Sequence, residues 1–221
     1  MKKAPQFDWM KSLEDEPLQF EFFKTAISDL KIKLMLSDIK YRVFGTAIML
    51  ELGAGEGQYS KYFDTTVPFC NTICVEIQPV NCKKIKKLLP NAKIYNGFVG
   101  DRIHSRETNH KSSVNKKFNL LDIYNENQIR CVDILHMDIQ GSEVSILQEL
   151  AENNLLERVK YFFISTHNYR HEMGIRNTYD LCIEILEREL GEKEIPFEYL
   201  YCSPEPMDLN GDGLIVLKTH C

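Results

Sequence analysis

The run IMLELGAGEG, residues 48–57, decides the fold of this chain. Apolar residues lead into an acid, Glu51, and a glycine then stands at every second position: Gly53, Gly55 and Gly57. An apolar run that ends in glycines is typical of a buried strand followed by a tight turn into a helix. Glycines let a ligand approach the backbone closely, and a helix N-terminus offers N–H groups to an anion. The run therefore predicts a strand, a ligand-binding loop and a helix.

A second acid stands at the corresponding place on the next predicted strand. This strand covers residues 72–77 and carries Glu76 near its end. The carboxyl ends of parallel strands meet at one edge of a sheet, where an acid can accept hydrogen bonds from both hydroxyls of a ribose. The two strands together predict a site for a nucleoside cofactor.

The glycine spacing favours S-adenosylmethionine (SAM) over a dinucleotide. Dinucleotide-binding loops commonly follow G-x-G-x-x-G, and Gln58 takes the place of the third glycine in that spacing. Glu51 would also repel a pyrophosphate, whereas SAM carries an ammonium, a sulfonium and only one carboxylate. We expect Glu51 and the three glycines at the methionine end of SAM, Tyr59 over its carboxylate, and Glu76 at the ribose. A dinucleotide site and a purely structural glycine turn remain the alternatives.

Strand and helix patterns alternate along the chain from residue 46. We predict strands at 46–52, 72–77, 92–97, 132–138 and 159–166, and helices at 57–64, 79–89, 141–153 and 176–190. Such alternation indicates a mostly parallel sheet with helices on both faces. Two more strands, at 197–201 and 214–218, follow without an intervening helix and predict an antiparallel hairpin. The expected fold is α/β and Rossmann-like, as in class I methyltransferases, with a C-terminal antiparallel hairpin.

The length of 221 residues suits one domain with an attachment. Apolar residues recur at helical spacing over 17–41, so we expect residues 1–45 to form an N-terminal helical extension. We expect it to cover the sheet or the cofactor pocket, with a contact to a second copy as the alternative. Residues 46–221 would form the domain that holds the site. The polar stretch 100–131 predicts a long excursion with at most a short strand at 114–119.

Charge and composition narrow the expected partners. The net charge is −5, and no long basic stretch is present, so we expect no nucleic acid as a partner. No apolar run approaches the roughly 20 residues that span a bilayer, so we expect no membrane. The first ten residues lack the apolar core of a secretion signal. The seven cysteines form no C-x-x-C pair, which favours reduced thiols in a cytoplasmic protein.

The second informative run is VDILHMDIQGSEVSIL, residues 132–147. An apolar strand ends at Asp138 and Gly141 opens a helix, so Asp138 should lie beside the glycine loop, at the methyl end of the cofactor. Ser142 and Glu143 suit the first turn of that helix, where polar oxygens and negative charge offset exposed N–H groups.

Together the two runs resemble the FkbM-type family of SAM-dependent methyltransferases. Its members carry ID-x-L-K-x-D-[VI]-[EQ]-G-x-E. Residues 133–143 correspond to this pattern from its first Asp onward, and the resemblance covers roughly residues 47–215. It implies that 46–221 is a SAM-dependent methyltransferase domain acting on a hydroxyl, often of a sugar or natural product. One departure is His136, where the family usually has lysine.

Methyl transfer to a hydroxyl benefits from a base whose pKa lies near neutrality. His167 directly follows the strand 159–166, and the ordinary pKa of histidine is about 6.5. We therefore expect His167 and Asp138 to be catalytic, Asp138 also to contact the cofactor, and Asp101 to hold the adenine amino group. A rival is a divalent metal held by Asp138, His167, Asn168 and His171, but the spacing of the two histidines suits a helix rather than a segment that leaves a strand. We expect no metal.

These inferences predict a cytoplasmic SAM-dependent methyltransferase that acts on an oxygen of a small molecule, such as a sugar or a natural product. One alternative is N-methylation of an amino-sugar or peptide. Another is a SAM-binding partner subunit without turnover. Homo-oligomerisation stays open.

Overall fold

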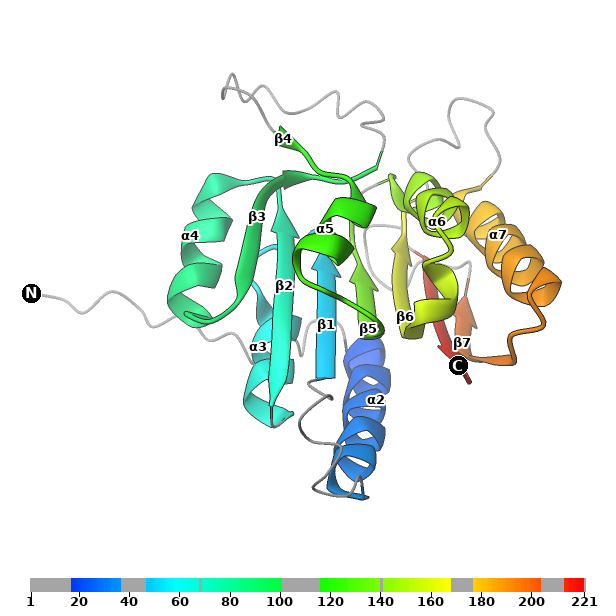
Figure 1. Cartoon of the computed structure of the whole chain (residues 1–221), viewed down its shortest axis with the longest axis horizontal. Coiled ribbons are helices and arrows are strands. Elements are labelled where there is room, and N and C mark those ends of the chain that lie inside the picture. The colour runs from blue at the N-terminus through cyan, green and yellow to red at the C-terminus, as the bar shows by residue number, and fades with distance from the viewer. Residues whose placement is uncertain are drawn as a thin grey trace, which may run out of the picture.

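The structure is a computed structural model that describes residues 17–36, 47–67, 69–100, 116–139, 141–167, 177–203 and 213–220. These residues build an eight-stranded sheet in the order β4-β3-β2-β1-β5-β6-β8-β7 (Figure 1). Its strands are β1 (Ala47–Leu52), β2 (Cys70–Glu76), β3 (Lys93–Phe98), β4 (Lys116–Lys117), β5 (Val132–Met137), β6 (Val159–Thr166), β7 (Phe197–Ser203) and β8 (Gly213–Thr219). All pairs from β4 to β6 are parallel, whereas β8 is antiparallel to both of its neighbours.

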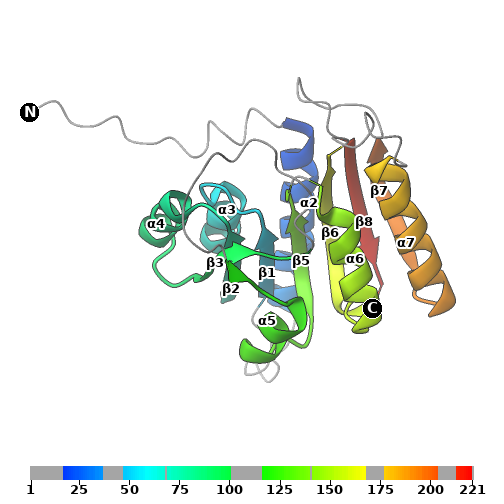
Figure 2. The same cartoon turned by 90° about the horizontal axis from the view of Figure 1, so that it is seen from above.

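Helices cover both faces of the sheet (Figures 1 and 2). One face carries α2 (Pro17–Leu36), α3 (Gln58–Thr66) and α4 (Pro79–Leu88). The other carries α5 (Leu120–Glu126), α6 (Glu143–Glu152) and α7 (Thr178–Glu192), with a short 3-10 turn, η2 (Leu156–Arg158), before β6. Alternate strand residues serve the two faces: Met49 packs with α2 and α3, while Leu50 and Leu52 pack with the opposite set.

The predicted parallel sheet and its antiparallel hairpin are confirmed, with strand ends that differ by a few residues. The sequence interpretation missed α5, which lies inside the stretch that we took for a polar excursion. Leu120, Ile123 and Tyr124 of this helix are buried against the sheet, and Asn119 caps it by accepting a hydrogen bond from the backbone N–H of Asp122. Only seven residues long, α5 is too short to show a clear helical period in the sequence.

Helix α2 is packed on the sheet through its apolar side chains. Phe20, Phe23, Ile27 and Leu30 are buried in one cluster with residues of β1, β5, β6 and β8. Residues 17–36 of the expected extension therefore pack on the sheet, whereas its division from the rest of the chain at 45/46 stays a prediction.

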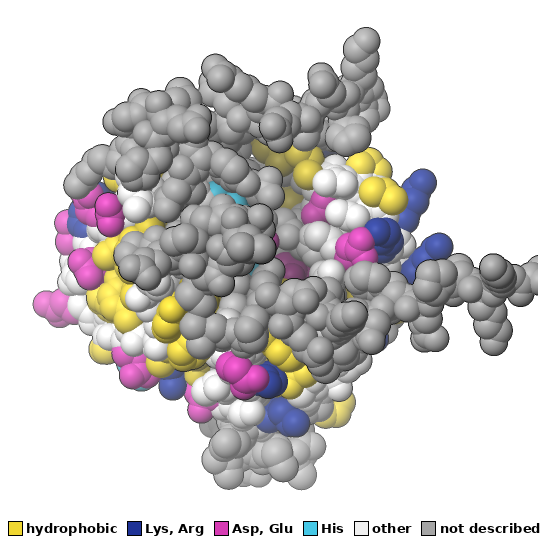
Figure 3. Space-filling view, turned by 180° about the vertical axis from the view of Figure 1, so that it is seen from behind, with side chains coloured by type: hydrophobic (Ala, Val, Ile, Leu, Met, Phe, Trp, Pro, Cys, Tyr) yellow, Lys and Arg dark blue, Asp and Glu magenta, His cyan; other side chains and the backbone are white. Residues whose placement is uncertain are grey.

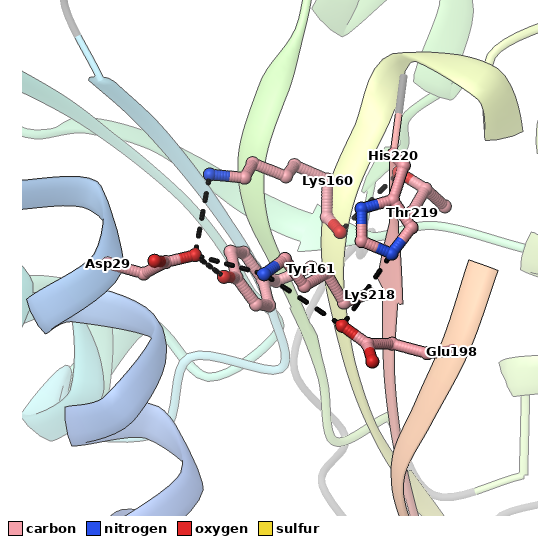
Figure 4. Close-up of polar contacts among 7 residues, drawn as sticks. All are labelled: Asp29, Lys160, Tyr161, Glu198, Lys218, Thr219 and His220. Atoms are coloured by element: carbon pink, nitrogen blue, oxygen red, sulfur yellow. Dashed lines mark hydrogen bonds and ion pairs between the residues drawn. The ribbon is translucent and has the colours of Figure 1, made fainter. Parts of the chain in front are cut away.

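Polar contacts also fasten α2 to the strands (Figure 4). The Tyr161 hydroxyl of β6 donates a hydrogen bond to Asp29 of α2, and Lys218 Nζ lies 3.2 Å from the same carboxylate. Lys160 Nζ stands 3.9 Å from it, and Lys218 also reaches Glu198 of β7 at 3.9 Å. The hydrogen bond from Tyr161 is the main cause that lowers the pKa of Asp29. These contacts join α2, β6, β8 and β7.

None of the described helices has both the length and the apolar character needed to cross a bilayer. Cys74 and Cys182 are buried free thiols. The cytoplasmic location that we inferred from the cysteines stays a prediction.

Candidate functional site

The glycine loop lies between the ends of β2 and β5. The backbone N–H groups of Gly53 and Ala54 donate hydrogen bonds of 2.9 and 3.1 Å to the carbonyl of Val75 in β2. Gly53 has a φ of 78°, and a Cβ there would lie 1.8 Å from the carbonyl oxygen of Asp138. A Cβ on Gly55 would meet nothing within 4 Å. The loop is therefore tightly held at Gly53 and open at Gly55, where a ligand can approach the backbone.

Glu76, the last residue of β2, is connected directly to this loop. Its Oε2 accepts a hydrogen bond of 2.8 Å from the Gly55 N–H, and its Oε1 accepts one of 2.7 Å from the Gln78 N–H. The side chain is buried, and burial raises its pKa even though these hydrogen bonds oppose the effect. Each carboxylate oxygen has a second lone pair that could accept a ribose hydroxyl.

Glu51 lies beneath the loop and is 2% exposed. It accepts a hydrogen bond from the Ser60 hydroxyl, and burial raises its pKa to about 8. His136 Nδ1 lies 3.6 Å from Glu51 Oε1, and burial lowers the pKa of His136 to about 4. At neutral pH both side chains are therefore uncharged, and their contact is not an ion pair.

Tyr59 is part of an aromatic cluster under the same loop. Its ring stacks on His136 with centroids 4.3 Å apart and makes an edge contact with Phe23 at 5.0 Å. Gln19 of α2 completes the cluster, because its Nε2 lies 2.8 Å from Nε2 of His136. This position explains the packing role of Tyr59, and its contact with the methionine carboxylate stays a prediction.

A chain of three charged side chains lies at the carboxyl edge of β5 and β6. His167 Nε2 is 3.2 Å from Asp138 Oδ1, and His167 Nδ1 is 2.7 Å from Glu143 Oε1. Burial alone would lower the pKa of His167, but the hydrogen bonds and charges of the two acids outweigh it and raise the pKa to about 10. Burial would raise the pKa of Asp138, but the hydrogen bond and charge of His167 bring it below its usual value.

The structure thus brings the glycine loop, Glu76, Asp138 and His167 together at one edge of the sheet, as predicted. At neutral pH the His167 ring carries a proton on each nitrogen and cannot accept another, so this environment does not favour the predicted role as a base. Asp101, Asn168 and His171 lie outside the described residues. Among the residues that are described, no cluster of His, Cys, Asp and Glu could hold a metal ion.

Sequence reasoning missed three residues of the site. Glu143 was expected only to stabilise the start of α6, yet it contacts a residue 24 positions further along the chain. Gln19 and Ser60 were not singled out at all. Their partners, His136 and Glu51, come from other elements, so no local spacing could have revealed these contacts.

Comparison with known proteins gives the fold. No family model and no curated protein sequence matches the chain. The N-terminal domain of human METTL16 has a TM-score of 0.51 at 13% identity, over 93% of this chain and 70% of that one. Human methyltransferase 10 domain containing protein has a TM-score of 0.50 at 10% identity, over 93% and 83%. The fibrillarin pre-rRNA processing protein of Methanococcus jannaschii has a TM-score of 0.50 at 16% identity, over 79% and 66%.

These similarities confirm the predicted Rossmann-like methyltransferase fold. The METTL16 domain is also known in complex with S-adenosylhomocysteine (SAH), the demethylated form of SAM, with a TM-score of 0.50 at 13% identity over 93% of this chain and 71% of that one. No comparison supports the narrower FkbM-type assignment.

The expectation that nucleic acid is excluded as a partner was wrong. A protein named for pre-rRNA processing has the same fold. The prediction rested on the net charge of the whole chain and on the lack of a long basic stretch, whereas phosphate contacts can come from a few local groups. Residues 77–100, for example, contain five lysines and no acid. On the face shown in Figure 3, the Lys and Arg side chains of the described residues stand near the rim beside acidic ones.

Proposed function

We propose that the chain is a SAM-dependent methyltransferase whose acceptor atom is bound next to Asp138. The observation that carries the proposal is the arrangement of the glycine loop between two acids, Glu76 on one side and Asp138 on the other. The loop is open at Gly55, where a Cβ would meet nothing within 4 Å. A ligand laid along the loop would thus have one acid at each end.

The residues present fit SAM better than a dinucleotide. Glu76 would accept hydrogen bonds from the ribose hydroxyls, and the start of α3 would offer N–H groups to the methionine carboxylate. Glu51 is buried and uncharged, so the negative charge beside the loop comes from Asp138, whose pKa is lowered; this charge would repel a pyrophosphate and attract a sulfonium. Asp101 is proposed to hold the adenine amino group. When bound, SAM would supply an electrophilic methyl group on its sulfonium.

The chain's own residues would orient the acceptor. Of the three contacting side chains Asp138, His167 and Glu143, Asp138 is the exposed one, with 41% of its side chain accessible. It can therefore accept a hydrogen bond from an N–H or O–H group of the acceptor. Holding the acceptor atom in line with the methyl carbon supplies much of the rate of such a displacement.

We infer a hydroxyl of a small molecule, such as a sugar or natural product, as the first candidate acceptor, on the strength of the FkbM-type resemblance of residues 48–57 and 132–147. For that acceptor, the Asp138 carboxylate would take up the hydroxyl proton as the methyl group is transferred and SAH is released. An amino group is the second candidate. It is favoured by the protonated state of His167, because an amine attacks through its lone pair and needs no base to remove its proton first.

Calorimetry and a turnover screen test the proposal. SAM and SAH should bind, and NAD should not. Incubation with methyl-labelled SAM and a panel of sugars, amino-sugars, peptides and RNA should then transfer label to one class of acceptor, and Asp138→Asn should slow that transfer while leaving SAH binding intact. Tight NAD binding without SAH binding would contradict the cofactor assignment. SAH binding without transfer to any acceptor would favour a partner subunit without turnover.

A further inference from the structure

A continuous chain of side-chain contacts runs from the protein interior to the edge of the sheet where we place the cofactor. It consists of Glu143, His167 and Asp138, and is called the charged chain below. We propose that Glu143 and His167 are positioning residues, which hold the Asp138 carboxylate, ionised and in a fixed direction, to accept a hydrogen bond from the methyl acceptor. This inference rests on the proposed function, and it assigns Glu143 a role beyond the start of α6.

The geometry gives this chain a direction. Glu143 is fully buried, and its two oxygens are both engaged: Oε1 with His167 Nδ1 at 2.7 Å and Oε2 with the Gly141 N–H at 2.9 Å. His167 is 3% exposed, and its carbonyl accepts a hydrogen bond of 2.9 Å from the Thr178 hydroxyl of α7. Both its ring and its backbone are therefore fixed. Only Asp138 reaches the surface, so it is the end of the chain that a ligand can touch.

The charges explain why all three members are needed. A buried carboxyl group without a partner is costly, and the partner of Glu143 is the positive His167, 2.7 Å away. The second ring N–H of His167 then points to Asp138 and favours its ionised form. One positive and two negative groups leave a single negative charge, and it is accessible at Asp138. This end should attract a neutral or cationic acceptor that carries an N–H or O–H, and should disfavour an acceptor whose reacting group is anionic.

A role confined to structure would predict something different. If Glu143 only satisfied the Gly141 N–H at the start of α6, then neutralising Glu143 would change stability but not the charge on His167 or Asp138. The NMR signals of the His167 ring protons and of the Asp138 carboxyl carbon report these charges. They therefore distinguish the two roles, and they can be measured without any turnover.

The experiment compares Glu143→Gln with Glu149→Gln. Both positions lie on α6, and Glu149 also accepts a backbone hydrogen bond, from Leu120 N at 2.6 Å, but it is not part of the chain. NMR titration of the ligand-free protein should show His167 doubly protonated through pH 8 in the unaltered protein and in Glu149→Gln. In Glu143→Gln the His167 midpoint should fall by about 1 pH unit or more, because one favourable charge is removed. For the acceptor identified by the labelled-SAM screen, the KM of Glu143→Gln should be about tenfold higher than that of the unaltered protein. This corresponds to a loss of about 1.4 kcal/mol in binding free energy.

Several outcomes would overturn the inference. One is a His167 that titrates near pH 6.5 in the unaltered protein. The other is a His167 midpoint that is the same in Glu143→Gln and Glu149→Gln. If Glu143→Gln does not fold, Asp138→Asn gives the same test from the exposed end, and its His167 midpoint should also fall. SAH binding is measured alongside: if SAH fails to bind the unaltered protein, the proposed function fails, whereas the NMR result still decides whether the charged chain exists.

Discussion

The side chain of Glu76 accepts a hydrogen bond of 2.8 Å from the backbone N–H of Gly55, so the acid at the end of β2 is tied to the turn that follows β1. This bond holds the loop in place without a ligand. Because the loop does not have to be ordered when a cofactor binds, less binding energy is lost to conformational entropy. The same carboxylate would then serve the loop and the ribose at once.

Replacing Glu76 with glutamine should weaken SAH binding about tenfold, or about 1.4 kcal/mol. The amide keeps the shape of the side chain but replaces one acceptor oxygen with a donor, which faces either the loop N–H or a ribose hydroxyl. Isothermal titration calorimetry measures the change. Glu126→Gln is the matched control, because Glu126 accepts a hydrogen bond of 2.8 Å from Tyr95 at a distance from the loop. Equal losses of affinity in the two variants would contradict the ribose assignment.

Alanine should affect two glycines of the same loop differently, with the larger loss of stability at Gly53 and a loss of SAH affinity at Gly55. At Gly53 the new Cβ would lie 1.8 Å from the Asp138 carbonyl, so Gly53→Ala should lower the free energy of unfolding by more than about 3 kcal/mol. At Gly55 the Cβ meets open space, and the left-handed backbone alone should cost about 1–2 kcal/mol. Gly55→Ala should nevertheless reduce SAH affinity more than tenfold, because the methyl group occupies the space proposed for the cofactor. Urea unfolding and calorimetry on both variants give the comparison, and an unchanged affinity in Gly55→Ala would place the ligand elsewhere.

The sequence was sufficient for the fold and for the outline of the site because both depend on local patterns. The buried strands β1, β2, β5 and β6 appear as short apolar runs, and the glycine loop and Asp138 follow directly from where those runs end. The order of parallel strands at one edge then brings Glu76 and Asp138 together without any further information.

Contacts between side chains that lie far apart in the chain could not be predicted from the sequence. Glu143 lies in the first turn of a helix, a position that acids favour for local reasons, and this hid its contact with His167. The protonation of His167 depends on two carboxylates and on burial. The position of a histidine directly after a strand does not reveal either of these. Tyr59 likewise looked available to a ligand because its stacking on His136 depends on the sheet behind it.

The buried Glu51 should make the stability of the fold depend on pH. Its pKa is about 8 in the folded protein against an ordinary value of 4.5, so the folded state holds this proton more tightly than the unfolded chain does. Its contribution to stability is therefore present below about pH 4.5 and is lost as the pH rises through about 8. His167, whose pKa is raised to about 10, acts in the same direction at higher pH.

We therefore expect the free energy of unfolding to decline between about pH 5 and pH 9, with His136 opposing the decline below about pH 6.5 because its pKa is lowered to about 4. In Glu51→Gln the decline should be about 4 kcal/mol smaller. Denaturant titrations across this range measure both slopes. The surface variant Glu126→Gln should keep the full decline. If Glu51→Gln kept it as well, Glu51 would be ionised in the folded protein at neutral pH.

The hydrogen bond between Gln19 and His136 provides a test of how α2 is coupled to the site. Gln19 Nε2 can only donate, so Nε2 of the uncharged His136 accepts, and the other ring nitrogen carries the proton. Within the described residues that other nitrogen, Nδ1, has no hydrogen-bond partner. Gln19→Leu would leave both ring nitrogens unsatisfied in the interior, and it should cost about 1–3 kcal/mol of unfolding free energy.

Adding His136→Phe should recover most of that loss, because it replaces the orphaned polar ring with an apolar one of similar shape that can still pack on Tyr59 and Phe23. Urea unfolding of the two single variants and the double variant gives the coupling energy directly, and we expect it to exceed about 1 kcal/mol. Leu30→Ala in the double background controls for general loosening of α2, since Leu30 is buried in the same helix but has no part in the polar contact. Its cost should be the same with or without the Gln19–His136 pair. Additive costs for the two substitutions at Gln19 and His136 would instead mean that α2 is held to the sheet by its apolar side chains alone.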